Sequence, residues 1–239
     1  MRSLNHTPLQ FINLFLIFIA ISVFVACSAD KKETEGYSKE APPSDISLFS
    51  LIEHSHSGVT FQNEFEENIK RMWYNFPTIY DGGGVALGDI NNDGLTDIYF
   101  TGNEVPNKLY LNKGDFQFED ITEKAGVAGG GGWHNGPTMV DINGDGYLDI
   151  YVCRGGWIKD ENQRSNLLFI NQKDGTFREL AFTFGLREKG YSFQSLFLDY
   201  DMDGDLDVYI INHPTKAGLE IPEYKQGYVS GSKFSKDRL

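Results

Sequence analysis

Short apolar runs recur along most of this chain, and glycine, asparagine and aspartate separate them. Short runs that are rich in β-branched and aromatic residues are typical of strands. The pattern therefore predicts a chain that is β throughout, with tight turns between the strands. The predicted strands lie at 85–88, 97–100, 109–111, 116–121, 138–140, 149–152, 167–170, 176–180, 196–198 and 207–210.

The first 27 residues follow a different pattern, with no aspartate or glutamate and one apolar run from Phe11 to Ala26. This run is shorter than the roughly 20 residues that span a bilayer, and it is typical of a secretory signal. It ends at Val25-Ala26-Cys27, which resembles a bacterial lipobox, although Phe24 stands where leucine is usual. We predict a signal peptide over 1–27 and lipidation of Cys27. An uncleaved signal anchor is the alternative.

Residues 28–45 are polar and charged and include two prolines. Such a segment has too little apolar area to fold alone, so it is predicted to be a tether. Its acidic and lysine-rich start resembles the export signals of bacterial surface lipoproteins. We expect an exported protein that is anchored by lipid to the outer membrane and exposed at the cell surface.

The remainder, 46–239, contains a repeat. A nonapeptide of pattern D-x-[DN]-x-D-G-x-x-D occurs at 89–97, 141–149 and 199–207, and a second motif, N-x-L-[YF]-[LI]-N-x-x-D-x-x-F, occurs at 107–118 and 166–177. A glycine followed by an aliphatic residue comes eight residues after the last phenylalanine of the second motif. Residues 49–59 share this ending. A repeat that contains four short strands is typical of a propeller blade.

The nonapeptide carries the candidate chemistry. Hard divalent cations prefer several oxygen ligands, and glycine at position 6 permits the sharp turn that brings such ligands together. Side chains at positions 1, 3, 5 and 9 and the carbonyl at position 7 would form each shell. Asx-Gly hairpin turns are the alternative, but they do not account for aspartate at position 9. Up to three Ca²⁺ ions are predicted, held by Asp89, Asn91, Asp93, Leu95 and Asp97; by Asp141, Asn143, Asp145, Tyr147 and Asp149; and by Asp199, Asp201, Asp203, Asp205 and Asp207.

Composition narrows the function further. The chain has 21 Lys and Arg against 34 Asp and Glu, a net charge of −13. This balance argues against nucleic acid as a partner, because neutralising phosphates requires a basic surface. It fits a protein that binds cations. Zinc is not favoured, because no loop contains histidine or cysteine.

Loops that end in aspartate at position 9 and lie between strands resemble the FG-GAP repeats of integrin-type propellers, also called VCBS repeats. Residues 84–103 and the N-x-L-Y-x-N element are most similar to the bacterial branch that resembles cartilage acidic protein, whose members often carry an ASPIC/UnbV domain at the C-terminal end. The resemblance implies a partial β-propeller of four-stranded blades with calcium-binding inter-strand loops. Because such propellers have about seven blades, we expect a fragment with three calcium loops and an incomplete fourth unit.

The function implied is a binding or adhesion module rather than an enzyme. Its partner would be an extracellular protein or glycan, and it would meet the membrane only through the lipid. Two alternatives stay open, namely a propeller scaffold for a polysaccharide-acting enzyme and structural support for a C-terminal domain. Outside the loops, the sequence predicts a buried Cys153, a solvated turn at His54 and His56, and packing roles for Tyr99, Tyr151 and Tyr209.

Overall fold

The computed structural model describes residues 49–68, 79–156 and 158–213. The chain divides into two units, Met1–Ser50 and Leu51–Leu239, and all the strands belong to the second. The predicted signal peptide, Cys27 and the tether lie outside the described residues. The strands are β1 (Val85–Gly88), β2 (Asp97–Phe100), β3 (Lys108–Asn112), β4 (Phe118–Asp120), β5 (His134–Val140), β6 (Asp149–Arg154), β7 (Leu167–Asn171), β8 (Phe177–Glu179), β9 (Ser192–Leu198) and β10 (Asp207–Asn212).

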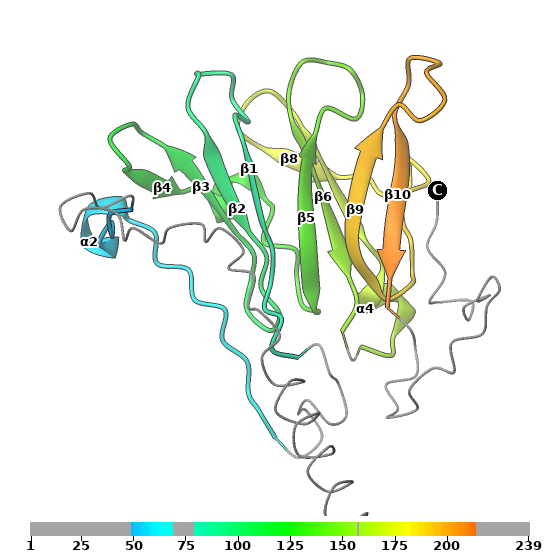
Figure 1. Ribbon diagram of the computed structural model, residues 1–239, viewed down its shortest axis with the longest axis horizontal. Coiled ribbons are helices and arrows are strands. Elements are labelled where there is room, and N and C mark those ends of the chain that lie inside the picture. Colours follow the sequence, from blue (N-terminus) through cyan, green and yellow to red (C-terminus); the bar gives the residue numbers. More distant parts are fainter. Residues whose placement is uncertain (1–48, 69–78, 157, 214–239) are drawn as a thin grey trace, which may run out of the picture. The chain divides into compact units, whose positions relative to one another are not determined.

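These strands form three antiparallel sheets in chain order (Figure 1). We call β1-β2-β3-β4 blade one, β5-β6-β7-β8 blade two and the two-stranded β9-β10 the third sheet. The first strands of successive sheets lie side by side, since β5 contacts both β1 and β9. Sequential antiparallel strands in neighbouring sheets are the arrangement of propeller blades. The predicted all-β, partial β-propeller fold is confirmed.

Strand β6 shows how the sheets are held together. All six of its residues are buried, so both of its faces are covered. Because successive side chains in a strand point to opposite faces, Ile150 and Val152 enter the core shared with blade one. Tyr151 and Cys153 enter a second core, with Ile210 of the third sheet. The stacking of sheets, rather than any one sheet, buries the apolar side chains.

Within the described ranges, three short helical turns interrupt the β structure, and the prediction of strands throughout missed them. They are α2 (His54–Ser57), α3 (Thr122–Ala125) and α4 (Glu161–Arg164). The first two end at Gly58 and Gly126, with φ of 71° and 75°, a conformation that glycine adopts without steric cost. These are the glycines of the repeated glycine–aliphatic ending. None of the helices in the described residues is long and apolar enough to cross a membrane.

The segment before the first blade packs against it. Phe61 stacks on Phe100 with ring centroids 5.0 Å apart, and the amide of Thr60 donates to the Tyr110 hydroxyl at 3.2 Å. Asn63 exchanges hydrogen bonds with Asn103, at 2.6 and 2.9 Å. Residues 60–63 therefore pack on β2, β3 and the connection between them, on the face opposite the one that blade two covers.

Candidate metal-binding loops

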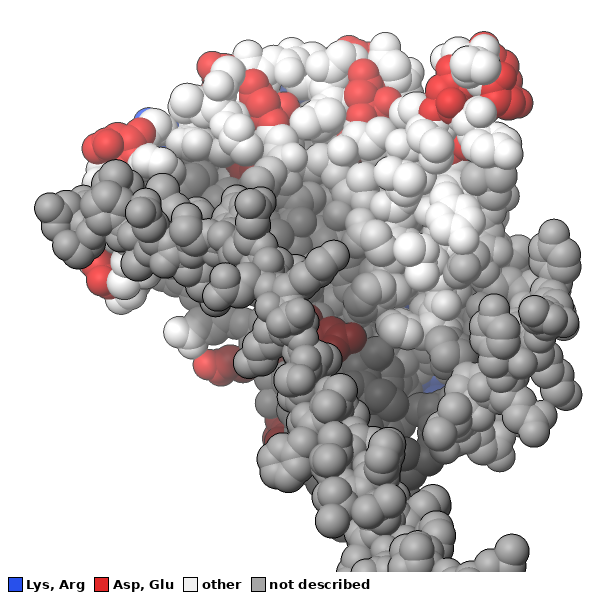
Figure 2. All heavy atoms as spheres, viewed as in Figure 1, with Lys and Arg blue, Asp and Glu red and all other residues white. Residues whose placement is uncertain are grey.

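The three nonapeptides each close a hairpin between the first two strands of a sheet. We call 89–97 loop one, 141–149 loop two and 199–207 loop three. In each, the last aspartate pairs in register with the end of the preceding strand: Asp97 with Gly88, Asp149 with Val140 and Asp207 with Leu198. All three loops lie at the same end of the sheets, where Figure 2 shows their acidic side chains in a row.

The first aspartate of every loop holds the turn closed. In loop one, the Asp89 carboxylate accepts the amide of Asp93 at 3.1 Å and that of Gly94 at 2.7 Å. The corresponding distances are 3.0 and 2.8 Å from Asp141 in loop two, and 3.1 Å for both bonds from Asp199 in loop three. These bonds fix the carboxylate and draw the chain around it.

The side chains at positions 3 and 5 are also oriented by backbone amides. In loop one, Asn91 Oδ1 accepts the Asp93 amide at 3.1 Å, and Asp93 Oδ1 accepts the Leu95 amide at 2.9 Å. Loop two repeats both bonds at 3.0 Å, through Asn143 and Asp145. A carbonyl or carboxylate oxygen has two lone pairs, so an oxygen that accepts one amide keeps capacity for a cation.

Loop three gathers the largest charge. The carboxylates of Asp199, Asp201 and Asp203 all lie within 4.8 Å of one another and are exposed. The pKa of Asp205 is raised by its hydrogen bond with the Asp203 side chain and by the neighbouring carboxylate charges. Such crowding of like charges is unfavourable without a cation. The donor set, all oxygen and strongly anionic, fits Ca²⁺.

The aspartate at position 9 has a further role that the sequence analysis did not foresee. Asp149 is fully buried, and its two oxygens accept the amides of Ile142 at 3.1 Å and Asn171 at 2.8 Å. Burial raises its pKa to about 6, against the lowering effect of these bonds. Asp97 accepts the amides of Ile90 and Asn112 in the same way, at 2.9 and 2.8 Å. Each carboxylate thus joins its loop to the third strand of its blade.

The sequence analysis also missed the roles of two further positions, one in each repeated motif. Position 4 is left-handed in every loop, with φ of 59° at Asn92, 68° at Gly144 and 60° at Met202. Asparagine and glycine tolerate this region, whereas methionine is strained there. The last asparagine of the second motif is the other position, since Asn112 and Asn171 each donate their Nδ2 to the carbonyl at loop position 8, at 2.8 and 3.1 Å. Its recurrence in the motif was the available signal.

Among the candidates outside the loops, Cys153, Tyr99 and Tyr151 have packing roles, whereas His56 lies at the surface. Cys153 is fully buried, which raises the pKa of its thiol to about 12. The hydroxyls of Tyr99 and Tyr151 donate to the carbonyls of Val127 and Leu186, at 2.7 and 2.9 Å. His56 is exposed and its Nε2 lies 2.8 Å from the Asp115 carbonyl oxygen. None of these groups has the environment of a reactive nucleophile or a metal ligand.

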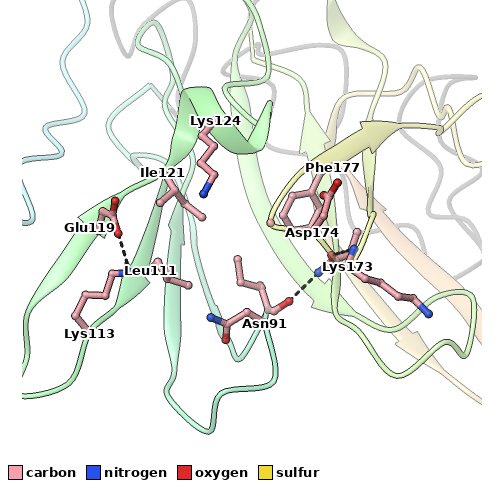
Figure 3. A pocket seen from close by; sticks show the side chains of 12 residues that line it. Asn91, Leu111, Lys113, Glu119, Ile121, Lys124, Lys173, Asp174 and Phe177 are labelled. Atoms are coloured by element: carbon pink, nitrogen blue, oxygen red, sulfur yellow. Dashed lines mark hydrogen bonds and ion pairs between the residues drawn. The ribbon is translucent and has the colours of Figure 1, made fainter.

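A cleft of about 400 Å³ opens between blade one and blade two, beside loop one (Figure 3). Its two acidic side chains are already engaged. Glu119 pairs with Lys113 Nζ at 2.7 Å, and Asp174 accepts the Thr176 hydroxyl at 2.6 Å and the Thr176 amide at 2.9 Å; these interactions lower the pKa of each carboxyl. A general acid for glycoside hydrolysis needs a raised pKa, so these carboxyls do not favour that chemistry.

The sheets and loops define a repeat protein of the propeller type. Residues 89–152 match the model of the FG-GAP-like repeat, and this part of the chain is an FG-GAP-like repeat. It is similar to "Cartilage acidic protein 1" of Xenopus tropicalis, with 32% identity, and of Homo sapiens, with 30% identity. Each alignment covers 56% of this chain and 20% of the relative, so the similar part spans about a fifth of those proteins.

Proposed function

We propose that loops one, two and three each bind a Ca²⁺ ion and that the chain is an extracellular binding module stabilised by these ions. The observation that carries the proposal is the repetition of one oriented set of oxygens at the same end of three successive sheets. The match of residues 89–152 to the FG-GAP-like repeat supports it, because proteins with such repeats are typically extracellular binding or adhesion modules and in general not enzymes.

The ion would supply the positive charge that the clustered carboxylates require. The side chains at positions 1, 3, 5 and 9 and the carbonyl at position 7 would hold it. The amide bonds to position 1 already orient the first ligand, so little reorganisation is needed on binding. Calcium would then act as a staple between the first two strands of each sheet, since binding to the folded chain alone raises its stability.

The test is thermal unfolding and isothermal calorimetry of the chain with Ca²⁺ and with a chelator. We expect Ca²⁺ to raise the melting temperature by at least about 10 °C, because each of three sites adds about 2 to 3 kcal/mol at a hundredfold excess over its Kd. Asp145→Asn keeps the shape of loop two and removes one charge. We expect it to lower the number of bound ions from three to two. Identical melting curves with and without Ca²⁺ would overturn the proposal.

The expected export and anchoring complete the proposed function. A lipid on Cys27 would place the module outside the cell, with residues 28–45 as the spacer, and its partner would be an extracellular protein or glycan. Metabolic labelling with a palmitate analogue tests the anchor: the unaltered chain should take up label and Cys27→Ala should not. Equal labelling of both would exclude lipidation at this cysteine.

A further inference from the structure

Loop one and loop two are connected to each other directly. Asn171, in the third strand of blade two, uses its Nδ2 group to donate to the Ile90 carbonyl of loop one at 2.8 Å. In return, the Asn92 Nδ2 of loop one donates to the Gly146 carbonyl of loop two at 2.9 Å. One hydrogen bond therefore joins the two loops directly, and a second joins loop one to the third strand of blade two.

Each of these bonds holds a peptide plane that leads into a proposed ligand of the neighbouring loop. The Ile90 carbonyl belongs to the peptide that continues into Asn91, whose side chain is the position-3 ligand of loop one. The Gly146 carbonyl belongs to the peptide that continues into Tyr147, whose own carbonyl is the position-7 ligand of loop two. Because a peptide unit is planar, fixing its carbonyl fixes the start of the next residue.

Asn171 is well placed to transmit a change between the loops. It is buried, and its Nδ2 group also donates to Leu148 of loop two at 3.1 Å while its backbone amide donates to Asp149 at 2.8 Å. An asparagine amide has two hydrogens, so both Nδ2 bonds form at once. One side chain thus contacts loop one and loop two together.

We propose that Asn171 and Asn92 are positioning residues that couple Ca²⁺ binding at loop one to Ca²⁺ binding at loop two. Ordering of either loop by an ion restricts a peptide plane of the other, so the second ion binds with less reorganisation and the coupling is positive. This inference rests on the proposed function, because it requires that both loops bind Ca²⁺.

The chain offers a matched control. Asn112 occupies in blade one the place that Asn171 occupies in blade two, with the same bonds to its own loop: its amide donates to Asp97 at 2.8 Å and its Nδ2 to Thr96 at 2.8 Å. In the described part of the chain, its side chain makes no bond to another loop. Asn112→Ala and Asn171→Ala therefore share the loss within the blade and differ in the bridge.

The experiment measures Ca²⁺ affinity by calorimetry in full chains with one site left active. With loop one alone active, through Asp145→Asn and Asp203→Asn, we expect Asn171→Ala to weaken binding at least fivefold. With loop two alone active, through Asp93→Asn and Asp203→Asn, we expect Asn112→Ala to change binding less than twofold. An unchanged affinity of loop one after Asn171→Ala would overturn the coupling.

A second variant guards against a general folding defect. Asn92 is exposed and left-handed, so Asn92→Gly keeps the turn and removes only the bond to Gly146. In a chain whose loop three is disabled by Asp203→Asn, Ca²⁺ should bind the two remaining loops with a steeper binding curve than two independent sites give. The coupling factor is the factor by which an ion at one loop raises the affinity of the other loop. Asn92→Gly should lower this factor at least twofold and leave the melting temperature of the Ca²⁺-free chain unchanged. Independent binding in the parent chain would overturn the coupling alone, whereas no binding at all would overturn the proposed function.

Discussion

Blade two and the third sheet contain the same hairpin in two different settings. Loop two lies beside a complete four-stranded sheet, and its position-9 aspartate is buried between two backbone amides. Loop three joins the two strands of a two-stranded sheet; Asp207 is half-buried and accepts the Tyr200 amide at 3.0 Å, and the described residues place no second amide on it. Yet the first aspartate makes the same bonds in both.

The comparison separates the interactions that form the turn from those that attach the loop to its blade. The turn itself is encoded locally, because the bonds to position 1 form both in blade two and in the third sheet, where residues up to 213 supply two strands. The attachment of the loop to its blade depends on the third strand, which supplies the asparagine amide. The two loops also differ in charge and exposure. Loop three has five acidic residues and is almost wholly exposed, whereas loop two is partly buried.

The largest expected effect tests this attachment. Asp149→Ala should lower the free energy of unfolding of the Ca²⁺-free chain by about 3 kcal/mol, because it leaves two buried amides without acceptors. Asp207→Ala should cost about 1 kcal/mol. Urea denaturation in metal-free buffer measures both. Equal losses would show that the third strand adds nothing to the aspartate's role.

A pH effect of intermediate size tests a second difference between blade two and the third sheet, at the ends of their first two strands that lie away from the loops. His134 pairs in register with Arg154 in blade two, where the third sheet has Ser192 opposite Asn212. Burial, together with the Arg154 charge, lowers the pKa of His134 to about 4. The unfolded chain takes up this proton near pH 6.5, so stability is retained above pH 6.5 and is lost as pH falls towards 4.

Between pH 7 and pH 5 this loss should amount to about 2 kcal/mol in the Ca²⁺-free chain. His134→Gln removes the titrating group, so its stability should vary less over the same interval. The difference between the two urea-denaturation series isolates the histidine from the carboxylates, which titrate in both chains. Parallel series would contradict the assignment of this pKa shift to burial in blade two.

The smallest effect concerns position 4. Met202→Gly should stabilise loop three by about 1 kcal/mol, because glycine adopts the left-handed conformation without strain. Gly144→Met should cost loop two a similar amount. Both changes are read from the melting temperature of the Ca²⁺-free chain. Effects of the same sign would show that side-chain contacts, rather than backbone conformation, determine the choice of residue here.

Much of the architecture could be predicted from the sequence, because each repeat contains the residue patterns of its own strands and turns. The strand 85–88 was predicted with its observed bounds, and the glycines before Val59 and Val127 do end turns. The turns themselves are helical, which short segments such as Thr122–Ala125 do not reveal. Nor could sequence spacing show that Asn171 contacts Ile90, since that bond depends on how two sheets stack.

The two-sided burial of β6 has a consequence for how this chain tolerates insertions. One added residue within Asp149–Arg154 would exchange the faces of every residue after it, sending Val152 and Cys153 each into the wrong interior and disrupting both neighbours together. The same addition among the glycines of 129–132, which join the blades, would leave all strand registers intact. Length variation among related chains should therefore concentrate in the connections and avoid the second strand of a blade.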